Sequence, residues 1–422
     1  MTPRVSPRGR AMPASPIRKL MPVAEEAKRR GVRVLHLNIG QPDLETPAVM
    51  RDRLARVDRT IAYTPSGGTP EYLGSLVEYH RRLGIDLEPS DLVATTGGSE
   101  ALLFAFFATT SEGDEALTVE PYYTNYNSFA TMAGIRLVTV PTSGDDGFHL
   151  PPREAWERAL TSRTRLVLLC NPNNPTGTVY TAEEVRAVAE FCRDHGLFFV
   201  SDEVYRELVY DGRTATSALT LSGFEDQVVV VDSLSKRYSA CGIRLGSLAT
   251  RNEELHQAVL RMAQGRLSPP GLAQLLATGA TELGKEYFDG IVAEYQGRRD
   301  LLFEGLTSIP GLFLRKPEGA FYFVARLPVT DSDDFARYLL SDFAHHGTTV
   351  MVAPAAGFYA TPGRGRDEVR IAYVLKKEDL TLAVDAFAAG LAAYRKARGI
   401  EELPATAVSA GARRPDFFTP AV

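Results

Sequence analysis

The chain has 422 residues, of which 44% are hydrophobic and 23% charged. This balance is typical of a globular protein, and it excludes a disordered, collagenous or coiled-coil body. The 47 basic and 52 acidic residues give a net charge of −5, which argues against a generic nucleic-acid or membrane-surface binder. The length predicts two or three domains.

The sequence also bears on the compartment of the protein. Its three cysteines, Cys170, Cys192 and Cys241, are too few and too scattered for a disulfide framework or a zinc site. The longest apolar run, residues 101–108, is far shorter than the roughly 18 residues of a membrane span. Residues 1–18 lack the apolar segment of a secretory signal. We therefore expect a cytoplasmic protein without a membrane partner.

The predicted elements change in character along the chain. The first twenty residues and those from 402 onward are rich in Pro, Arg or Gly, which predicts flexible tails. In the middle, apolar runs at 166–170, 197–200 and 228–231 alternate with stretches of helical period such as 181–195. This alternation predicts a parallel sheet that is covered on both faces.

The last third of the chain has a different pattern. We predict helices at 295–306 and 378–398, and strands at 319–327, 349–352 and 368–374. Elements segregated in this way predict a second, α+β domain. The hinge between the domains is expected near residues 290–300.

Chemically unusual residues follow the three apolar strands of the middle region. The three sequences are Asn-Pro-Asn-Asn-Pro-Thr-Gly at 171–177, Ser-Asp-Glu-Val-Tyr at 201–205 and Asp-Ser-Leu-Ser-Lys-Arg at 232–237. Each alone has an ordinary explanation, as a turn, a helix cap or a surface lysine. Ligands of open parallel sheets bind beyond the carboxyl ends of the strands. Together the three sequences therefore predict one shared site.

These motifs, with Gly-Ile-Arg-Leu-Gly at 242–246, resemble the class I, fold-type-I pyridoxal-phosphate aminotransferases. The resemblance covers about residues 21–394. Two further stretches, 37–43 and 350–357, resemble the aspartate-aminotransferase-like branch. The family implies pyridoxal 5′-phosphate as the cofactor. It also implies transfer of an amino group between an L-amino acid, possibly aspartate or glutamate, and a 2-oxo acid.

The resemblance also implies an α/β fold with a mainly parallel, seven-stranded sheet between helices. We expect the large cofactor-binding domain at residues 46–296 and the smaller α+β domain at 297–400. Residues 1–45 would form an N-terminal arm and part of the small domain, and residues 401–422 a flexible tail.

The family's cofactor contacts carry over onto matching residues. Lys236 would form the internal Schiff base and then move the Cα proton. Asp202 would pair with the pyridine nitrogen and keep it protonated. Asn174 and Tyr205 would hydrogen-bond the ring oxygen O3′. Tyr123 would stack on the ring, in preference to its neighbour Tyr122.

The phosphate would be held by a group of donors. A helix N-terminus is a good anion site because free N–H groups converge there, although Ser99 could also be a plain helix cap. The expected cofactor-binding residues in this group are Gly98, Ser99, Glu100, Ser233, Ser235 and Arg244, together with Tyr63, which would reach the phosphate of a neighbouring subunit. The role of Tyr63 implies a homodimer with shared active sites.

Substrate recognition rests on fewer residues. Arg370 matches the arginine that binds the α-carboxylate, and Gly40 and Asn174 would lie near the same group. Burying an arginine in an apolar strand costs free energy unless its charge is paired, and a bound carboxylate would supply that pair. A structural ion pair within the protein is the alternative role for Arg370. If Arg266 of the other subunit reaches the site, aspartate or glutamate is favoured. If Arg266 caps a helix or contacts solvent, amino acids other than aspartate and glutamate are also possible substrates.

Two other functions use the same fold. The cofactor also supports elimination, replacement, C–C bond formation and cyclisation, so a specialised biosynthetic enzyme of that kind is the main alternative. A regulator's ligand-binding module is the other. The absence of a visible DNA-binding segment and the acidic charge argue against the regulator.

Overall fold

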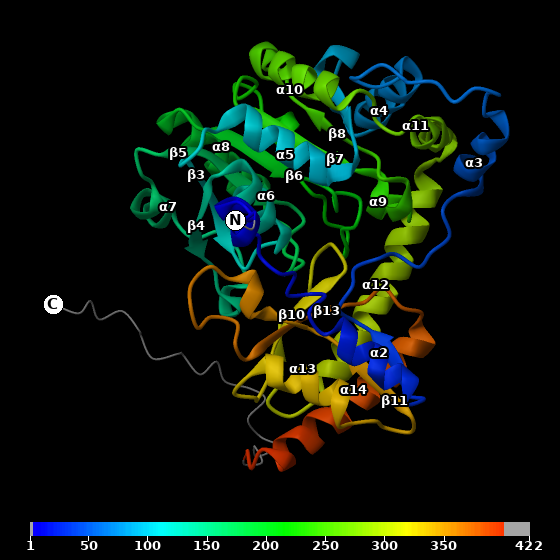
Figure 1. The fold of residues 1–422 in the computed structure, drawn as a ribbon, viewed down its shortest axis with the longest axis vertical. Helices are drawn as coiled ribbons and strands as arrows, with labels where there is room; N and C mark the ends of the chain where they lie inside the picture. The colour runs from blue at the N-terminus through cyan, green and yellow to red at the C-terminus, as the bar shows by residue number, and fades with distance from the viewer. Residues whose placement is uncertain (1–2, 401–422) are drawn as a thin grey trace.

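The structure, a computed structural model, describes residues 3–400, so the predicted tail at 401–422 lies outside the described residues. Its upper half in Figure 1 is built on a seven-stranded sheet in the order β2-β8-β7-β6-β5-β3-β4. The strands are β2 (Leu92–Thr95), β3 (Glu115–Glu120), β4 (Arg136–Pro141), β5 (Thr164–Cys170), β6 (Phe198–Asp202), β7 (Val228–Ser233) and β8 (Gly246–Ala249). Only β8 runs antiparallel to its neighbours in this sheet, which confirms the mainly parallel prediction.

Helices cover both faces of this sheet, because its strands are apolar on both sides. In β5, Leu166 and Leu168 face one cluster of side chains, and Val167 and Leu169 face the other. The first face is covered by α5 (Gly97–Thr109), α6 (Asn125–Ala133) and α10 (Glu253–Arg266). The second is covered by α4 (Pro70–Arg82), α7 (Arg153–Ala159), α8 (Ala182–His195) and α11 (Gly271–Ala277).

The start of α8 shows why the helical prediction for 181–195 is right. The Thr181 side chain accepts from the Glu184 backbone N–H, and the Glu184 side chain accepts from that of Thr181. This reciprocal pair satisfies two backbone donors that a helix start otherwise leaves unpaired. Gly196 ends the helix in the left-handed conformation, at a φ of 63°.

The lower half of Figure 1 contains two smaller sheets. Their strands are β1 (Arg33–His36) paired in parallel with β11 (Thr348–Met351), and β12 (Ala353–Pro354), β13 (Glu368–Ala372), β10 (Tyr322–Arg326) and β9 (Phe313–Leu314) in one antiparallel sheet. The helices here are α2 (Met21–Arg29), α13 (Ser332–Ser341) and α14 (Lys377–Ala397). Each C-terminal strand and helix predicted from the sequence overlaps one of these elements or α12.

A single helix, α12 (Lys285–Thr307), runs without a break through the predicted hinge at 290–300. Arg298 on this helix pairs with Asp43 at 2.6 Å, and Arg299 pairs with Asp211 at 2.7 Å. The predicted helix at 295–306 is thus only the second half of α12, and the domain boundary at 296/297 stays a prediction that falls within it.

The prediction that the first twenty residues form a tail is wrong for residues 3–20. They include the short helix α1 (Pro7–Ala11), beside α6 in Figure 1, where Arg8 pairs with Glu112 at 3.1 Å. Ile17 packs on a cluster around Phe358, and Leu20 is buried. Two apolar residues within a Pro- and Arg-rich stretch suffice to anchor it, and composition alone hides them.

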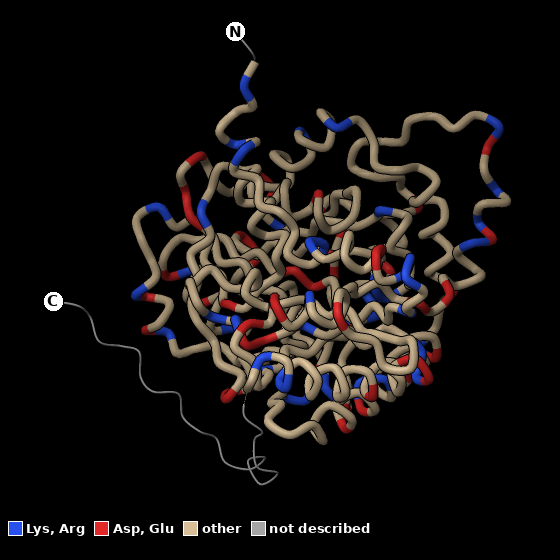
Figure 2. Tube along the Cα trace, turned by 60° about the horizontal axis from the view of Figure 1, so that its bottom comes forward, with Lys and Arg blue, Asp and Glu red and all other residues tan. Residues whose placement is uncertain are grey.

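Within residues 3–400, no helix is both long and apolar enough to cross a bilayer. No group of three or more His, Cys, Asp or Glu side chains in that range could hold a metal ion. Figure 2 shows basic and acidic residues interspersed along the chain, as the small net charge predicts.

Candidate active site

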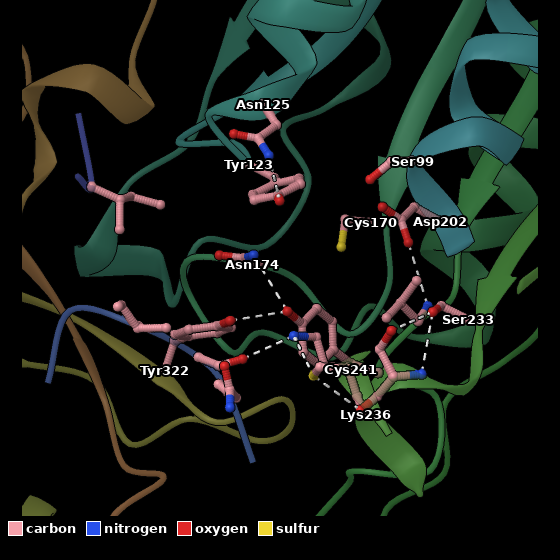
Figure 3. Close-up of a pocket in the computed structure, with 18 of the residues that line it drawn as sticks. Ser99, Tyr123, Asn125, Cys170, Asn174, Asp202, Ser233, Lys236, Cys241 and Tyr322 are labelled. Carbon is pink, nitrogen blue, oxygen red and sulfur yellow. Dashed lines mark hydrogen bonds between the residues drawn. The ribbon is translucent and has the colours of Figure 1, made fainter. Parts of the chain in front are cut away.

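A cavity of about 570 Å³ lies where β5, β6 and β7 end, and it is lined from both halves of the molecule. Twelve of the predicted site residues line it: Gly40, Gly98, Ser99, Tyr123, Asn174, Asp202, Tyr205, Ser233, Ser235, Lys236, Arg244 and Arg370. The volume is within the usual range for a cofactor or small-molecule site. Figure 3 shows Tyr123 and Asn125 above, Ser99 and Ser233 at one side, Tyr322 at the other and Lys236 below.

Lys236 lies on α9 (Leu234–Arg237), the single helical turn that follows β7. Its Nζ donates to the Gly40 carbonyl at 2.8 Å and lies 5.7 Å from the centre of the Phe321 ring. The next residue, Arg237, turns away and binds both oxygens of the buried Asp232 at 2.7 Å. The one-turn helix therefore directs a lysine into the cavity and an arginine into the core.

Asp202, at the end of β6, is a buried carboxylate without a cationic partner among the described residues. It accepts hydrogen bonds from the Tyr126 hydroxyl at 2.7 Å and the Val204 N–H at 3.3 Å. Burial raises the pKa of Asp202 to about 6, and these two hydrogen bonds oppose the shift. Such a group favours a protonated nitrogen beside it, which is what a pyridinium ring supplies.

Two tyrosines and an amide form a network beside Lys236. The Tyr205 and Tyr322 hydroxyls are 3.0 Å apart, and the Asn174 amide donates weakly to Tyr205 at 3.5 Å. Burial raises the pKa of Tyr205, so its phenol stays a neutral hydrogen-bonding group. A Cβ atom at Gly40 would lie 1.8 Å from the Tyr322 hydroxyl, so only glycine fits there.

The sequence did not single out Tyr322. It lies in the predicted strand 319–327, where no motif separates it from neighbouring apolar residues. Tyr126, whose hydroxyl donates to Asp202, was also missed, because no motif marks it in the sequence.

The two adjacent tyrosines at 122 and 123 differ in position. Tyr123 lines the cavity, and the Asn125 amide donates to its hydroxyl at 2.7 Å. Tyr122 is buried, and its hydroxyl donates to Asn127 at 2.9 Å. The geometry thus makes Tyr123 the residue able to face a bound ring.

Small residues and donors gather at the start of α5. Gly97 has a φ of 72°, and a Cβ there would lie 2.7 Å from an Arg244 guanidinium nitrogen. The Ser233 hydroxyl donates to that of Ser235 at 2.8 Å. A helix N-terminus, hydroxyls and a guanidinium in one corner make a site that suits a phosphate.

Arg370, on β13, is only 2% exposed and has no acidic partner among the described residues. Its terminal nitrogens donate to the Asn174 side chain at 3.1 Å and the Asn38 carbonyl at 2.7 Å, whereas its Nε has no partner. The guanidinium lies over the rings of Tyr322 and Phe358, at 4.4 and 5.0 Å from their centres. A buried cation of this kind favours an anionic ligand.

Three predicted site residues, Glu100, Arg266 and Tyr63, do not line the cavity. Glu100 accepts from the Thr96 backbone N–H at 2.7 Å and pairs with Arg266 at 2.8 Å. Arg266 also donates to the Ser66 carbonyl at 2.8 Å. Glu100 and Arg266 therefore neutralise each other's charge outside the cavity. This ion pair favours a structural role for both residues. Tyr63 is 82% exposed.

Residues 32–387 match the family model of class I and II aminotransferases. The chain belongs to this family. The aminotransferase is 31% identical over 373 residues to an aspartate aminotransferase of Geobacillus stearothermophilus, covering 86% of this chain and 92% of that protein. It is 32% identical over 372 residues to an aspartate/prephenate aminotransferase of Thermus thermophilus, covering 86% and 93%.

Solved structures agree with this assignment. An aspartate aminotransferase from Thermus thermophilus with maleate superposes with a TM-score of 0.83 and 30% identity, covering 92% of this chain and 100% of that one. An alanine aminotransferase from Pyrococcus furiosus has a TM-score of 0.84 and 27% identity at the same coverage.

These likenesses confirm the predicted family, fold class, cofactor and type of reaction. The aminotransferase depends on pyridoxal phosphate and moves an amino group between an amino acid and a 2-oxo acid. The residues around the cavity fit this cofactor, because a phosphate corner, an aromatic face, an unpaired carboxylate and a lysine all meet there.

Proposed function

We propose that this aminotransferase uses Lys236 as its catalytic amine and takes a dicarboxylic amino acid, aspartate or glutamate, as amino donor. The observation that carries the proposal is the meeting of three unusual side chains in one cavity. They are a half-buried lysine and, as far as residues 3–400 show, a carboxylate without a cationic partner and an arginine without an acidic partner. The names of the aspartate aminotransferase relatives support the substrate class.

The cofactor would be held by several parts of the cavity. Asp202 would pair with the ring nitrogen, Asn174 and Tyr205 would hydrogen-bond the ring oxygen, and Tyr123 would lie on the ring face. The phosphate would take the donors of Ser99, Ser233, Ser235 and Arg244. When bound, the cofactor supplies an electron sink for the substrate Cα.

The chain itself supplies positioning and proton transfer. Lys236 would hold the cofactor, and its amine would move a proton at the substrate Cα. The carbonyl of Gly40, 2.8 Å from Nζ, orients that amine. Arg370 holds the α-carboxylate and so fixes which bond at Cα faces Lys236.

A panel of amino acids, each mixed with the cofactor-loaded enzyme without an acceptor, tests this proposal. We expect aspartate or glutamate to shift the cofactor absorbance and release one equivalent of 2-oxo acid. Release of ammonia, or of an adduct, in place of 2-oxo acid would favour the elimination or bond-forming alternative.

Arg370→Lys is expected to raise KM for every amino acid tested, because all of them carry the α-carboxylate. Lysine cannot reproduce the planar, two-bond geometry of a guanidinium. The loss should be about 1.5–3 kcal/mol, or roughly 10- to 100-fold. Steady-state kinetics measure it, with Arg366→Lys on an exposed side chain as the matched control. A KM that rises only for one substrate would contradict this role.

We also propose a cytoplasmic homodimer with shared sites. The chain between α3 (Ala48–Arg51) and α4 swings out at the upper right of Figure 1. It exposes Leu54, Ile61 and Tyr63 by 45%, 66% and 82%. Ile61 borders a hollow with Leu272 of α11, which is 40% exposed. Apolar side chains gathered on a surface support an interface with a second copy.

Mixing two defective chains tests the shared site. An inactive Lys236→Ala chain, combined with a Tyr63→Ala chain at limiting cofactor, should form heterodimers in which one site has both residues intact. We expect activity above the sum of the separate chains. No recovery, after subunit exchange is verified by mass, would mean that each chain builds its own site.

A further inference from the structure

The N-terminal segment borders the cavity, although its composition predicts a tail. Ser15, Ile17 and Arg18 all line the cavity, and dark-blue N-terminal chain passes on the Asn174 and Tyr322 side of Figure 3. The segment therefore contributes a cationic side chain that none of the proposed cofactor contacts uses.

Contacts on both sides of Arg18 hold this segment in place. The Asn38 side-chain amide donates to the Ile17 carbonyl at 3.2 Å. Lys19 forms an ion pair with Asp333 of α13. The Arg18 backbone N–H donates to the Ser15 carbonyl at 3.2 Å, which closes a turn. Arg18 thus sits at the cavity because the backbone around it is fixed.

The cavity is lined by more cationic than acidic side chains, and Arg18 is the cation to which the proposed function assigns no anion. Four cationic side chains line it, Arg18, Lys236, Arg244 and Arg370, against one acidic side chain, Asp202. In the proposed function Arg244 takes the phosphate, Lys236 the cofactor, Asp202 the ring nitrogen and Arg370 the α-carboxylate. Within residues 3–400 the Arg18 guanidinium has no hydrogen bond or ion pair. Arg18 is exposed at the edge of the cavity, so its guanidinium is free to bind one more anion there.

The position of Arg18 favours the substrate end over the phosphate end, because its neighbour Ile17 packs on the cluster around Phe358 that Arg370 also contacts. Asn38 links the two segments, since its amide donates to the Ile17 carbonyl and its own carbonyl accepts from Arg370. Burial raises the pKa of Tyr123 to about 12, and the positive charges of Arg370 and Arg18 both act against that rise. The two guanidinium groups thus act on the same phenol. Arg370 contacts Asn174, whereas Arg244 lies at the start of α5, beside Gly97.

We propose that Arg18 binds the distal carboxylate of a dicarboxylic amino acid whose α-carboxylate is held by Arg370. This inference rests on the proposed function and deepens it, since it assigns the acidic-substrate contact to the same chain and not to Arg266. Two guanidinium groups at one end of the cavity give a dicarboxylate two charge-assisted anchors, and a monocarboxylate can use only one.

The test compares aspartate with alanine in the cofactor-loaded enzyme. Arg18→Ala is expected to lower the ratio of kcat/KM for aspartate to that for alanine by about 10- to 100-fold. Arg18→Lys should keep part of the preference, because the charge remains but the two-bond geometry is lost. Arg10→Ala is the matched control, since Arg10 is on the same segment but does not line the cavity; it should leave the ratio unchanged.

A binding measurement without turnover provides the second readout. Calorimetry with maleate should show weaker binding to Arg18→Ala by a similar factor. Isocrotonate, the cis monocarboxylate with the same carbon skeleton, should bind both proteins alike. Equal maleate affinity in the two proteins, or a parallel loss for aspartate and alanine, would overturn the proposal. So would a change in the ratio caused by Arg266→Ala and not by Arg18→Ala.

Failure of the proposed function has a different signature. In that case the unchanged protein would convert no amino acid to a 2-oxo acid, yet the maleate comparison would still decide the role of Arg18. If the unchanged protein transaminates neutral amino acids and neither aspartate nor glutamate, the reaction type stands and the Arg18 assignment is wrong.

Discussion

Lys236→Ala is expected to lower kcat at least about 10³-fold, because it removes both the covalent attachment of the cofactor and the amine that moves the Cα proton. Seven other lysines occur in the chain, but none of them lines the cavity. Borohydride reduction of the loaded enzyme, followed by peptide mapping, should place the cofactor label on Lys236.

Lys285→Ala is the control for this experiment, because Lys285 is exposed and pairs with Asp289 on its own helix. It should keep full turnover. A label on any lysine other than Lys236, or a Lys236→Ala protein with normal kcat, would refute the assignment.

Asp202→Ala should impair the chemical step more than cofactor retention. In the proposed function the phosphate donors and Lys236 would hold the cofactor independently, so the carboxylate would act mainly on the charge of the ring. Loss of one preorganised electrostatic contact in a buried site costs about 10²- to 10³-fold in kcat. Single-turnover kinetics on fully loaded protein measure this step apart from binding.

Asp202→Asn separates charge from shape at the same position. Its side-chain oxygen can still accept from Tyr126, but it carries no negative charge to hold a proton on the ring. We expect it to lose most of the activity that Asp202→Ala loses. Near-normal turnover in both variants would mean that another group keeps the ring protonated.

The convergence of the central residues could be predicted because parallel strands align their ends. Cys170 at the end of β5 is in register with Asp202, and Asp202 is in register with Val231 of β7. Residues that follow these strands must therefore lie side by side. Local sequence and the resemblance together were enough to expect Asn174, Asp202 and Lys236 in one cavity.

Other features depend on long-range packing that no short motif reports. Tyr322 reaches the cavity only because Gly40, far away in the sequence, leaves room for its hydroxyl. Arg18 lies in a segment that composition marks as a tail. Gly290 lies within α12, and glycine disfavours a helix interior, so the sequence predicted only the second half of this helix.

The fate of the amino nitrogen distinguishes transamination from the other reactions of this cofactor. The enzyme is incubated with ¹⁵N-labelled glutamate and a 2-oxo acid, and the products are separated by mass spectrometry. We expect the label in the amino acid formed from that 2-oxo acid, in amounts equal to the 2-oxoglutarate released. Label in free ammonia, with none in a new amino acid, would contradict this expectation.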